Sequence, residues 1–411
     1  MSSSPIIGRD LTNNEIKSEQ VKNQVLVFVF ILISCLVVFL IILVSKTTRV
    51  YFCLNKLTIL NSNQINQKSL IDLGVKHSKN YNTEKLRDFF VASAYLPYVC
   101  YYHKFDYVSL EVFRDILKYG PRFVELQIFN SGYGKDVEPV ISIGEEKGEW
   151  KYTLNSINLK EFLKVIAAKV FSPDLKVHKD PFILFLNLKV NRNIRCLNKI
   201  HRYIYDILGQ FLLDTKYSYN SKDDNVKFRD ITIEECYQKI IIFSTSGFEE
   251  SNLEELVNYS TVSNYTLKNF KNQYRMLYIK NNDILDNEDD LEENTINHKI
   301  KIKDLQDYNK CSFTIVSPQN YNDGIFEGIS PINHETGKGF ESGSQFIMIN
   351  YQKIDTNMSN YIYVFKDSSF ILKDDTLKSN DNNQCNKYFS GEIKEFKDRN
   401  QSELNYIYTK K

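Results

Sequence analysis

The sequence predicts an α/β protein: a (β/α)₈ barrel of the TIM type, preceded by one transmembrane helix. Two observations carry this prediction. An uncharged apolar run lies near the N-terminus, and strand-like and helix-like segments alternate over roughly 290 residues after it. Repeated strand–helix units build a parallel sheet, and a closed eight-stranded barrel is the simplest such sheet for a chain of this length.

The apolar run spans Val25–Val44 and contains no charged residue. About 20 residues at a rise of 1.5 Å span a hydrocarbon core of about 30 Å. A core helix would keep a polar stripe, and a cleaved signal peptide would have a shorter apolar region followed by a small-residue cleavage site. Instead, Lys46 and Arg49 follow the run as a stop-transfer flank. We therefore expect a retained single-pass anchor.

The side of the membrane on which the rest of the chain lies is weakly determined, because similar numbers of basic residues flank the run on both sides. Sequons at Asn258, Asn264, Asn357 and Asn400 are no more than chance gives in a chain rich in Asn, Ser and Thr. The seven cysteines are scattered, odd in number and without a CxxC pair. This pattern argues against a disulfide framework and a structural zinc site, and slightly favours a reducing, cytoplasmic side.

The charge balance excludes one class of partner. The chain has 52 Lys and Arg against 51 Asp and Glu, a net charge of +1, and lacks the basic patch that nucleic-acid binding needs. The expected partner is therefore the lipid bilayer, together with a protein that the sequence does not identify.

Short apolar runs rich in aromatic and β-branched residues predict the strands, and apolar residues at helical spacing predict the helices. Strands are expected near 89–99, 122–129, 138–144, 181–190, 239–244, 312–317 and 345–351. Helices are expected at Ser109–Lys118, Asn158–Phe171 and Cys196–Leu213, with a helix-like segment at Leu253–Tyr259. The acidic segment Asn282–Asn294 lacks the spacing of an EF-hand and is expected to be a solvated loop.

These elements give an expected domain order. It comprises a disordered tail (1–24), a transmembrane helix (25–45), a stalk (46–84), a first half-barrel (85–216), a linker (217–230), a second half-barrel (231–376) and a polar tail (377–411).

Three segments of the first half follow one another as DILKYGPRFVELQ (115–127), EPVISIG (138–144) and PFILFLN (181–187). The second half carries LVNY (256–259), GSQFIMINYQ (343–352) and FILK (370–373). In this order and spacing they resemble the X and Y halves of eukaryotic-type phosphoinositide-specific phospholipase C. The resemblance implies a TIM-type barrel of the phospholipase C-like phosphodiesterase kind, split by a linker.

The resemblance also implies where a catalytic site would lie. The family uses two histidines for proton transfer and a calcium ion held by oxygen ligands. The matching catalytic positions here are Tyr95, Leu96, Glu125, Gln127, Ile143 and Asn187. The positions matching head-group contacts are Phe243, Thr245, Ile315 and Ser317. Only Glu125 keeps the family's residue, so we expect neither an intact catalytic set nor a calcium site.

The resemblance and its losses predict a membrane-anchored, catalytically inactive barrel that acts as a binding or scaffold protein. One alternative is an active phosphodiesterase or phospholipase of altered mechanism that uses Glu125, His103 or Tyr95. A lone histidine in an aromatic stretch such as YYHKF is more often a packing or surface residue than a catalyst. A second alternative is a structural membrane or envelope protein.

Overall fold

The structure is a computed structural model that describes residues 13–60, 66–77, 80–132, 136–144, 151–219, 221, 227–261, 275–286, 299–318, 332–379 and 385. The chain divides into two units, Met1–Phe52 and Cys53–Lys411. Most of the acidic segment 282–294 and part of the linker 217–230 lie outside the described residues.

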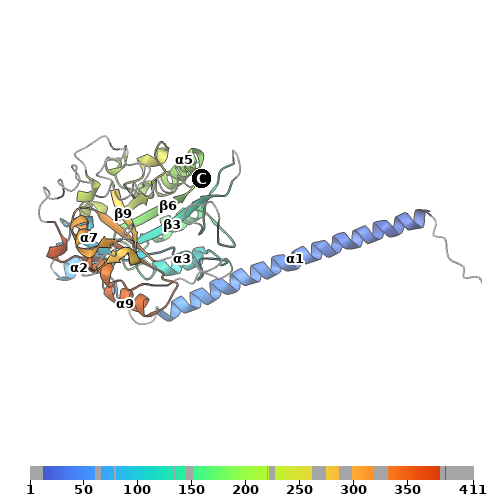
Figure 1. Cartoon of the computed structure of the whole chain (residues 1–411), viewed down its shortest axis with the longest axis horizontal. Coiled ribbons are helices and arrows are strands. Elements are labelled where there is room, and N and C mark those ends of the chain that lie inside the picture. The colour runs from blue at the N-terminus through green and yellow to red at the C-terminus, as the bar shows by residue number, and fades with distance from the viewer. Residues whose placement is uncertain are drawn as a thin grey trace, which may run out of the picture. The chain divides into compact units, whose positions relative to one another are not determined.

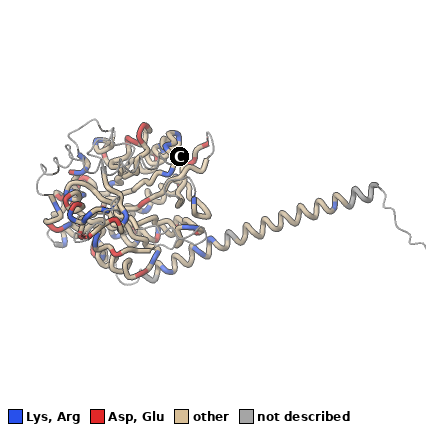
Figure 2. Tube along the Cα trace, viewed as in Figure 1, with Lys and Arg blue, Asp and Glu red and all other residues tan. Residues whose placement is uncertain are grey.

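The helix α1 (Asn13–Leu60) is 48 residues long and contains the predicted apolar run. Along that run the trace carries no charged residue (Figure 2). The helix continues beyond both predicted ends because no Gly or Pro interrupts residues 13–60. It therefore begins inside the segment expected to be a disordered tail. By length and composition, α1 is able to cross a membrane.

Eight strands of the second unit form a closed parallel barrel, as predicted (Figure 1). In barrel order they are β2 (Ser93–Ala94), β3 (Phe123–Asn130), β6 (Phe182–Lys189), β7 (Ile240–Ser244), β8 (Tyr259–Thr261), β9 (Arg275–Lys280), β12 (Phe313–Ser317) and β13 (Phe346–Ile349). The barrel closes because β2 pairs in parallel with both β13 and β3.

The described helices are α2 (Leu70–His77), α3 (Leu110–Leu117), α4 (Leu159–Lys169), α5 (Ile194–Leu208), α6 (Ile233–Cys236), α7 (Ile302–Asn309), α8 (Gly337–Glu341) and α9 (Thr356–Val364). Several begin at side chains that cap their first backbone N–H groups, such as Ser109 for α3, Asn158 for α4 and Asp355 for α9. The helices predicted at 109–118 and 158–171 are therefore confirmed. α5 is shorter than predicted because Gly209 follows it and a 3₁₀ turn, Gly209–Phe211, takes over.

Two strand predictions and one helix prediction need correction. The segment 89–99 divides into β1 (Phe89–Val91), which pairs antiparallel with β14 (Phe370–Leu372), and the barrel strand β2. The segment 138–144 forms β4 (Pro139–Ile141), which pairs antiparallel with β3 and with β5 (Ile157–Asn158), so it lies outside the barrel. The segment 253–259 is only a 3₁₀ turn, Asn252–Glu255, before β8 begins at Tyr259.

Aromatic rings from six barrel strands pack together in the interior. This aromatic layer consists of Phe123, Phe185, Phe243, Tyr259, Phe313 and Phe346. The ring centroids of Phe123 and Phe346 are 4.5 Å apart, and those of Tyr259 and Phe313 are 5.1 Å apart. Phe228, at the end of the predicted linker, adds a seventh ring at 5.7 Å from Phe243. The linker thus contributes to the core.

Residues expected to form a stalk pack on the barrel. Cys53 and Leu57, near the end of α1, are buried, and the hydroxyl of Tyr119 donates to the carbonyl of Leu57. The side chain of Gln67 donates to the carbonyls of Tyr119 and Phe365, at 3.3 and 2.8 Å. Gly120 has φ +82°, and a Cβ there would overlap the Gln67 side chain, so this contact requires glycine.

The end of α1 meets loops at the carboxyl ends of the strands. Lys56 places its Nζ 4.7 Å from the ring centroid of Tyr101, which follows β2. Lys353, which follows β13, donates to the hydroxyl of the same tyrosine at 3.2 Å. The segment that connects α1 to the barrel therefore reaches the end where parallel strands present their functional loops.

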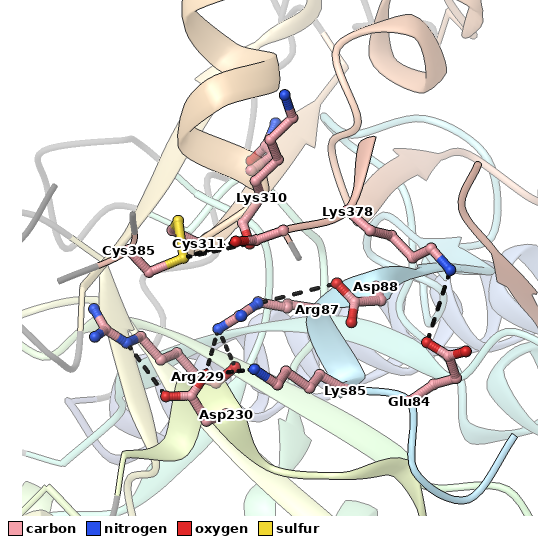
Figure 3. A network of polar contacts seen from close by, with 12 residues as sticks. Glu84, Lys85, Arg87, Asp88, Arg229, Asp230, Lys310, Cys311, Lys378 and Cys385 are labelled. Atoms are coloured by element: carbon pink, nitrogen blue, oxygen red, sulfur yellow. Dashed lines mark hydrogen bonds and ion pairs between the residues drawn. A yellow bond between two sulfur atoms is a disulfide. The ribbon is translucent and has the colours of Figure 1, made fainter. Parts of the chain in front are cut away.

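A cluster of charged residues lies beside β1 (Figure 3). Arg87, fully buried, donates to the carboxylate of Asp230 at 2.7 Å and to the carbonyl of Arg229 at 3.1 Å. Lys85 pairs with the same carboxylate at 3.2 Å. Asp88 and Lys373 are buried close by, and burial raises the pKa of Asp88 and lowers that of Lys373 to about 7. The two groups oppose each other's shifts because they carry opposite charges.

One disulfide joins Cys311 to Cys385, 74 residues apart. The cysteine pattern had argued against disulfides, so this finding corrects that expectation. A single bridge between distant residues leaves no spacing signature in the sequence. Cys311 precedes β12, and Cys385 lies beyond β14. The bond therefore fixes part of the segment expected to be a free polar tail.

Reduction of this disulfide is expected to destabilise the protein. In the chain-entropy treatment, a bridge that closes a loop of this length stabilises the fold by about 4 kcal/mol. Thermal unfolding of the full-length chain in detergent should therefore show a melting temperature several degrees lower with reductant than without. Cys385→Ser should melt like the reduced wild type and should not respond to reductant. Equal melting of the oxidised and reduced wild type would contradict the assignment.

Candidate functional site

Four of the six predicted catalytic positions converge at the carboxyl ends of β2, β3 and β6. Tyr95 directly follows β2, and Glu125 and Gln127 project from the same face of β3. Asn187 of β6 stands opposite Gln127 in the parallel register. In barrels of this kind, functional side chains gather at this end. These four matched positions therefore lie at one end of the barrel.

Glu125 is the centre of the site and is fully buried. Its Oε1 accepts a hydrogen bond from the Asn187 amide at 2.7 Å, and its Oε2 accepts one from the Tyr278 hydroxyl at 3.3 Å. The Gln127 side chain also bonds to this carboxyl group. Three neutral side chains, those of Asn187, Tyr278 and Gln127, thus form hydrogen bonds with the carboxylate.

Burial raises the pKa of Glu125 to about 7. The hydrogen bonds from Asn187 and Tyr278 and the charge of Lys189 act in the opposite direction, but burial dominates. The same desolvation, together with the Glu125 charge, holds the pKa of Tyr278 well above its ordinary value. Glu125 therefore exchanges its proton near neutral pH, and Tyr278 remains a donor.

His103 lies against Tyr95, with ring centroids 5.7 Å apart in an edge-to-face arrangement. Both side chains are buried. Burial lowers the pKa of His103 to about 4, and the side chain of Asn350 opposes this shift. His103 is therefore neutral at pH 7. Of the two roles expected for this histidine, packing or surface, it has the packing role.

Two tyrosines of the site have no counterpart in the sequence prediction. Tyr98 accepts a hydrogen bond from the backbone N–H of Gln127 at 3.1 Å and donates to the carbonyl of Ser142 at 3.1 Å. It thereby fixes β3 to the end of β4. Tyr278 was missed because its strand, β9, was not predicted. The short apolar run Met276–Ile279 is the signal that was available.

Leu96 and Ile143 occupy the remaining catalytic positions with apolar side chains, both buried. Leu96 has φ +45°, a left-handed conformation in which a leucine is strained and an asparagine is far more common. The resemblance assigns an asparagine to this position. The backbone at Leu96 thus has a shape suited to a small polar residue, while the side chain supplies no ligand.

The positions matched to head-group contacts also hold no cation. Phe243 belongs to the aromatic layer, and Ile315 is fully buried. The hydroxyl of Thr245 accepts from the backbone N–H of Leu188 at 2.9 Å, and that of Ser317 donates to the carbonyl of Ile279 at 3.2 Å. These four residues stabilise the barrel wall.

The donor set does not fit a calcium ion. A hard cation needs six to eight oxygen ligands, several of them anionic. Glu125 is the sole carboxylate among the six matched positions, and donors already engage both of its oxygens. Within the described ranges, no group of three or more His, Cys, Asp or Glu is arranged to hold a metal.

Comparison with known proteins supports this fold. Residues 82–246 match the family model described as "Phosphatidylinositol-specific phospholipase C, X domain". The crystal structure of PLC21 from L. pealei superposes with a TM-score of 0.54 at 18% identity, over 73% of this chain and 38% of that one. PLC21 from S. officinalis gives 0.55 at 19% identity, over 74% and 38%. No curated protein sequence matches significantly.

The chain thus has the barrel fold of phosphoinositide-specific phospholipase C, with an X-domain match over residues 82–246. The aligned region spans less than two fifths of the length of the two PLC21 chains. At this identity the likeness concerns the fold.

The raised pKa of Glu125 predicts a pH-dependent stability. In the unfolded chain a glutamate titrates near pH 4.3, whereas in the fold its pKa is about 7. The native state holds the proton more tightly, so this contribution is complete below about pH 4.3 and is lost as pH rises through about 7. The loss is on the order of 3 kcal/mol.

Glu125→Gln, which stays neutral, should flatten this decline between pH 5 and pH 8 in urea unfolding of the full-length protein in detergent. Asp180, whose pKa burial also raises to about 7, contributes equally to both proteins and cancels in the comparison. Glu138→Gln is the matched control, because the pKa of Glu138 is lowered and it titrates below this window. Identical pH profiles for the wild type and Glu125→Gln would contradict the assigned pKa.

Proposed function

We propose that this chain is a membrane-anchored, phospholipase C-like barrel without phosphodiesterase activity, and that it acts as a binding or scaffold protein. The observation that carries the proposal is the state of Glu125. This carboxylate is enclosed by Asn187 and Tyr278, which donate to both of its oxygens. In this arrangement it serves as the acceptor of a neutral hydrogen-bond network.

The remaining groups do not supply the missing chemistry. Cleavage of a phosphodiester by the family's route needs a base for the attacking hydroxyl and an acid for the leaving oxygen. Tyr95 and Ile143 stand at the two histidine positions, and an ordinary tyrosine with a pKa of about 10 is a poor base at neutral pH. His103 has a pKa of about 4, which makes it a weak base as well.

Charge at the site argues the same way. An inositol phosphate needs cationic or multiple N–H donors to offset its negative charge. The four matched head-group positions carry apolar or hydroxyl side chains whose polar atoms bond to the barrel backbone. A phosphorylated ligand would find no cation at these positions.

A buried side chain beyond the carboxyl end of β13 has polar atoms that support a binding role at this end of the barrel. Gln352 follows β13 and is buried, and within the described part of the chain neither its amide nitrogen nor its oxygen has a hydrogen-bond partner. Such atoms are costly unless water or a ligand satisfies them. An uncharged polar ligand suits these groups better than a phosphate does.

An active enzyme of altered mechanism is the second candidate, and one observation favours it. The pKa of Glu125, about 7, lies in the range that suits a general acid or base. In this alternative Glu125 would move the proton, and the chain would be a phosphoric diester hydrolase of the phosphatidylinositol phospholipase C type.

The two candidates predict opposite results in a hydrolysis assay. The full-length chain in mixed micelles should release no inositol phosphate from phosphatidylinositol or its bisphosphate in millimolar calcium, because both histidine positions and two acidic ligand positions are lost. Turnover that Glu125→Gln abolishes and Glu138→Gln retains would refute the inactive-barrel proposal and establish the alternative.

Calcium is expected to leave the stability of the barrel unchanged. A ligand at 100 times its dissociation constant adds about 2.7 kcal/mol to stability, which would raise the melting temperature by about a degree or two at least. No such shift should appear at millimolar calcium. The acidic residues between 288 and 293 are a possible weak site, so a variant with amides in their place is the control. A shift that persists in this control and disappears in Glu125→Gln would mean that a calcium site survives at the mouth.

A further inference from the structure

Whether the bond between Cys311 and Cys385 persists depends on the redox state of the compartment in which the barrel lies. It connects the turn between α7 and β12 to the chain beyond β14, with the two Cα atoms 5.1 Å apart. That separation is within the range of disulfides. Both cysteines are about 1% exposed, so the bond is enclosed once the chain has folded.

We propose that the barrel lies on the oxidising, non-cytosolic side of its membrane, where Cys311 and Cys385 are the site of a permanent covalent cross-link. The N-terminal segment before α1 then lies in the cytosol. This proposal is independent of whether the barrel is catalytically active. It reverses the slight preference for a cytoplasmic barrel, which rested on the expectation that no disulfide forms.

Compartment chemistry is the first argument. Structural disulfides form and persist in oxidising compartments, whereas cytosolic thiol systems keep cysteines reduced. In the step proposed here, the thiolate of one cysteine attacks the disulfide of a protein oxidoreductase to give a mixed disulfide. The second cysteine displaces the oxidoreductase, which leaves as a dithiol carrying the two electrons and, with solvent, the two protons.

The other cysteines give a second, independent argument. In the second unit Cys53, Cys100, Cys196 and Cys236 are all buried. Burial raises the pKa of Cys53 and of Cys196 to about 12, which keeps these thiols protonated and unreactive. Within the described residues the exposed cysteine is Cys35, which lies in the apolar run of α1. No described thiol of the barrel is thus open to unwanted oxidation or exchange.

The position of the bond gives it a structural purpose. It fixes the chain that follows β14 close to the charged cluster beside β1 (Figure 3). Lys378 of this chain pairs with Asp375 at 2.8 Å and with Glu84 at 3.8 Å. The bond and these ion pairs therefore connect both ends of this segment to the rest of the second unit.

The proposed side also bears on the ligand. Anionic phosphoinositides belong to the cytoplasmic leaflet. A barrel on the opposite side cannot reach their head groups. Such a barrel has no need of cations that bind phosphate, which agrees with the uncharged side chains at the four head-group positions. The partner is then a molecule of the non-cytosolic compartment.

The test uses the full-length chain in membranes of a eukaryotic host, with an N-terminal tag. The membranes are dissolved in denaturant that contains N-ethylmaleimide, which blocks every free thiol including the buried ones. After the reagent is removed, the protein is reduced and labelled with a mass-tagged maleimide. The wild type should gain a shift that corresponds to two newly released thiols. Cys311→Ser should lose this shift, and Cys236→Ser, which changes a buried cysteine outside the bond, should keep it.

Protease added to intact vesicles shows directly on which side of the membrane the barrel lies. The tag should be removed while the barrel remains protected, and detergent should abolish the protection. Two results would overturn the proposal: blocking of Cys311 and Cys385 before reduction, or digestion of the barrel in sealed vesicles. Both measurements use the wild type, so they hold even where a cysteine variant fails to fold.

Discussion

Packing of aromatic rings inside a closed barrel is the constraint on which the rest of the second unit depends. Several barrel strands are very short, β2 with two residues and β8 with three, so ladder hydrogen bonds alone hold them weakly. Each fully buried phenylalanine contributes roughly 1.5 to 3 kcal/mol, and aromatic pairs add somewhat more. The aromatic layer occupies the interior and ties six strands to one another. The layer also uses Phe243, which turns a position matched to ligand recognition into core.

Above this layer, at the carboxyl ends of the strands, lies the candidate site around Glu125. Glu125 stays on β3, and Leu96 keeps a left-handed conformation that suits an asparagine. Asn187 and Tyr278 then supply donors where an ion would need acceptors. A buried carboxylate needs compensation of some kind. The neutral donors lower the pKa of Glu125, but burial outweighs them and the pKa stays raised.

The sequence predicted the parts of the fold whose signals are local and strong. Long buried strands such as β3 and β6, and capped helices such as α3 and α4, lie where their patterns indicated. β8 has three residues, which is too short for a pattern to show. β9 has six residues but lacks the alternation of a half-buried strand, and it was not predicted. The segment at β4 has the pattern of a strand, and it forms one. Its neighbouring strands and its antiparallel direction, which place it outside the barrel, are set by tertiary pairing that the local pattern does not show. The same limit applies to Tyr278 and to the Cys311–Cys385 bond, which bring together residues distant in the chain.

The last turns of α1 join the barrel at the end of the strands that also carries the candidate site. Lys56 and Lys353 meet at Tyr101, so the chain enters the barrel beside the loops that follow β2 and β13. Those loops also carry Tyr95, His103 and Gln352. The last turns of α1, which belong to the second unit, therefore join the barrel at the end of the strands where Glu125 and Asn187 also lie.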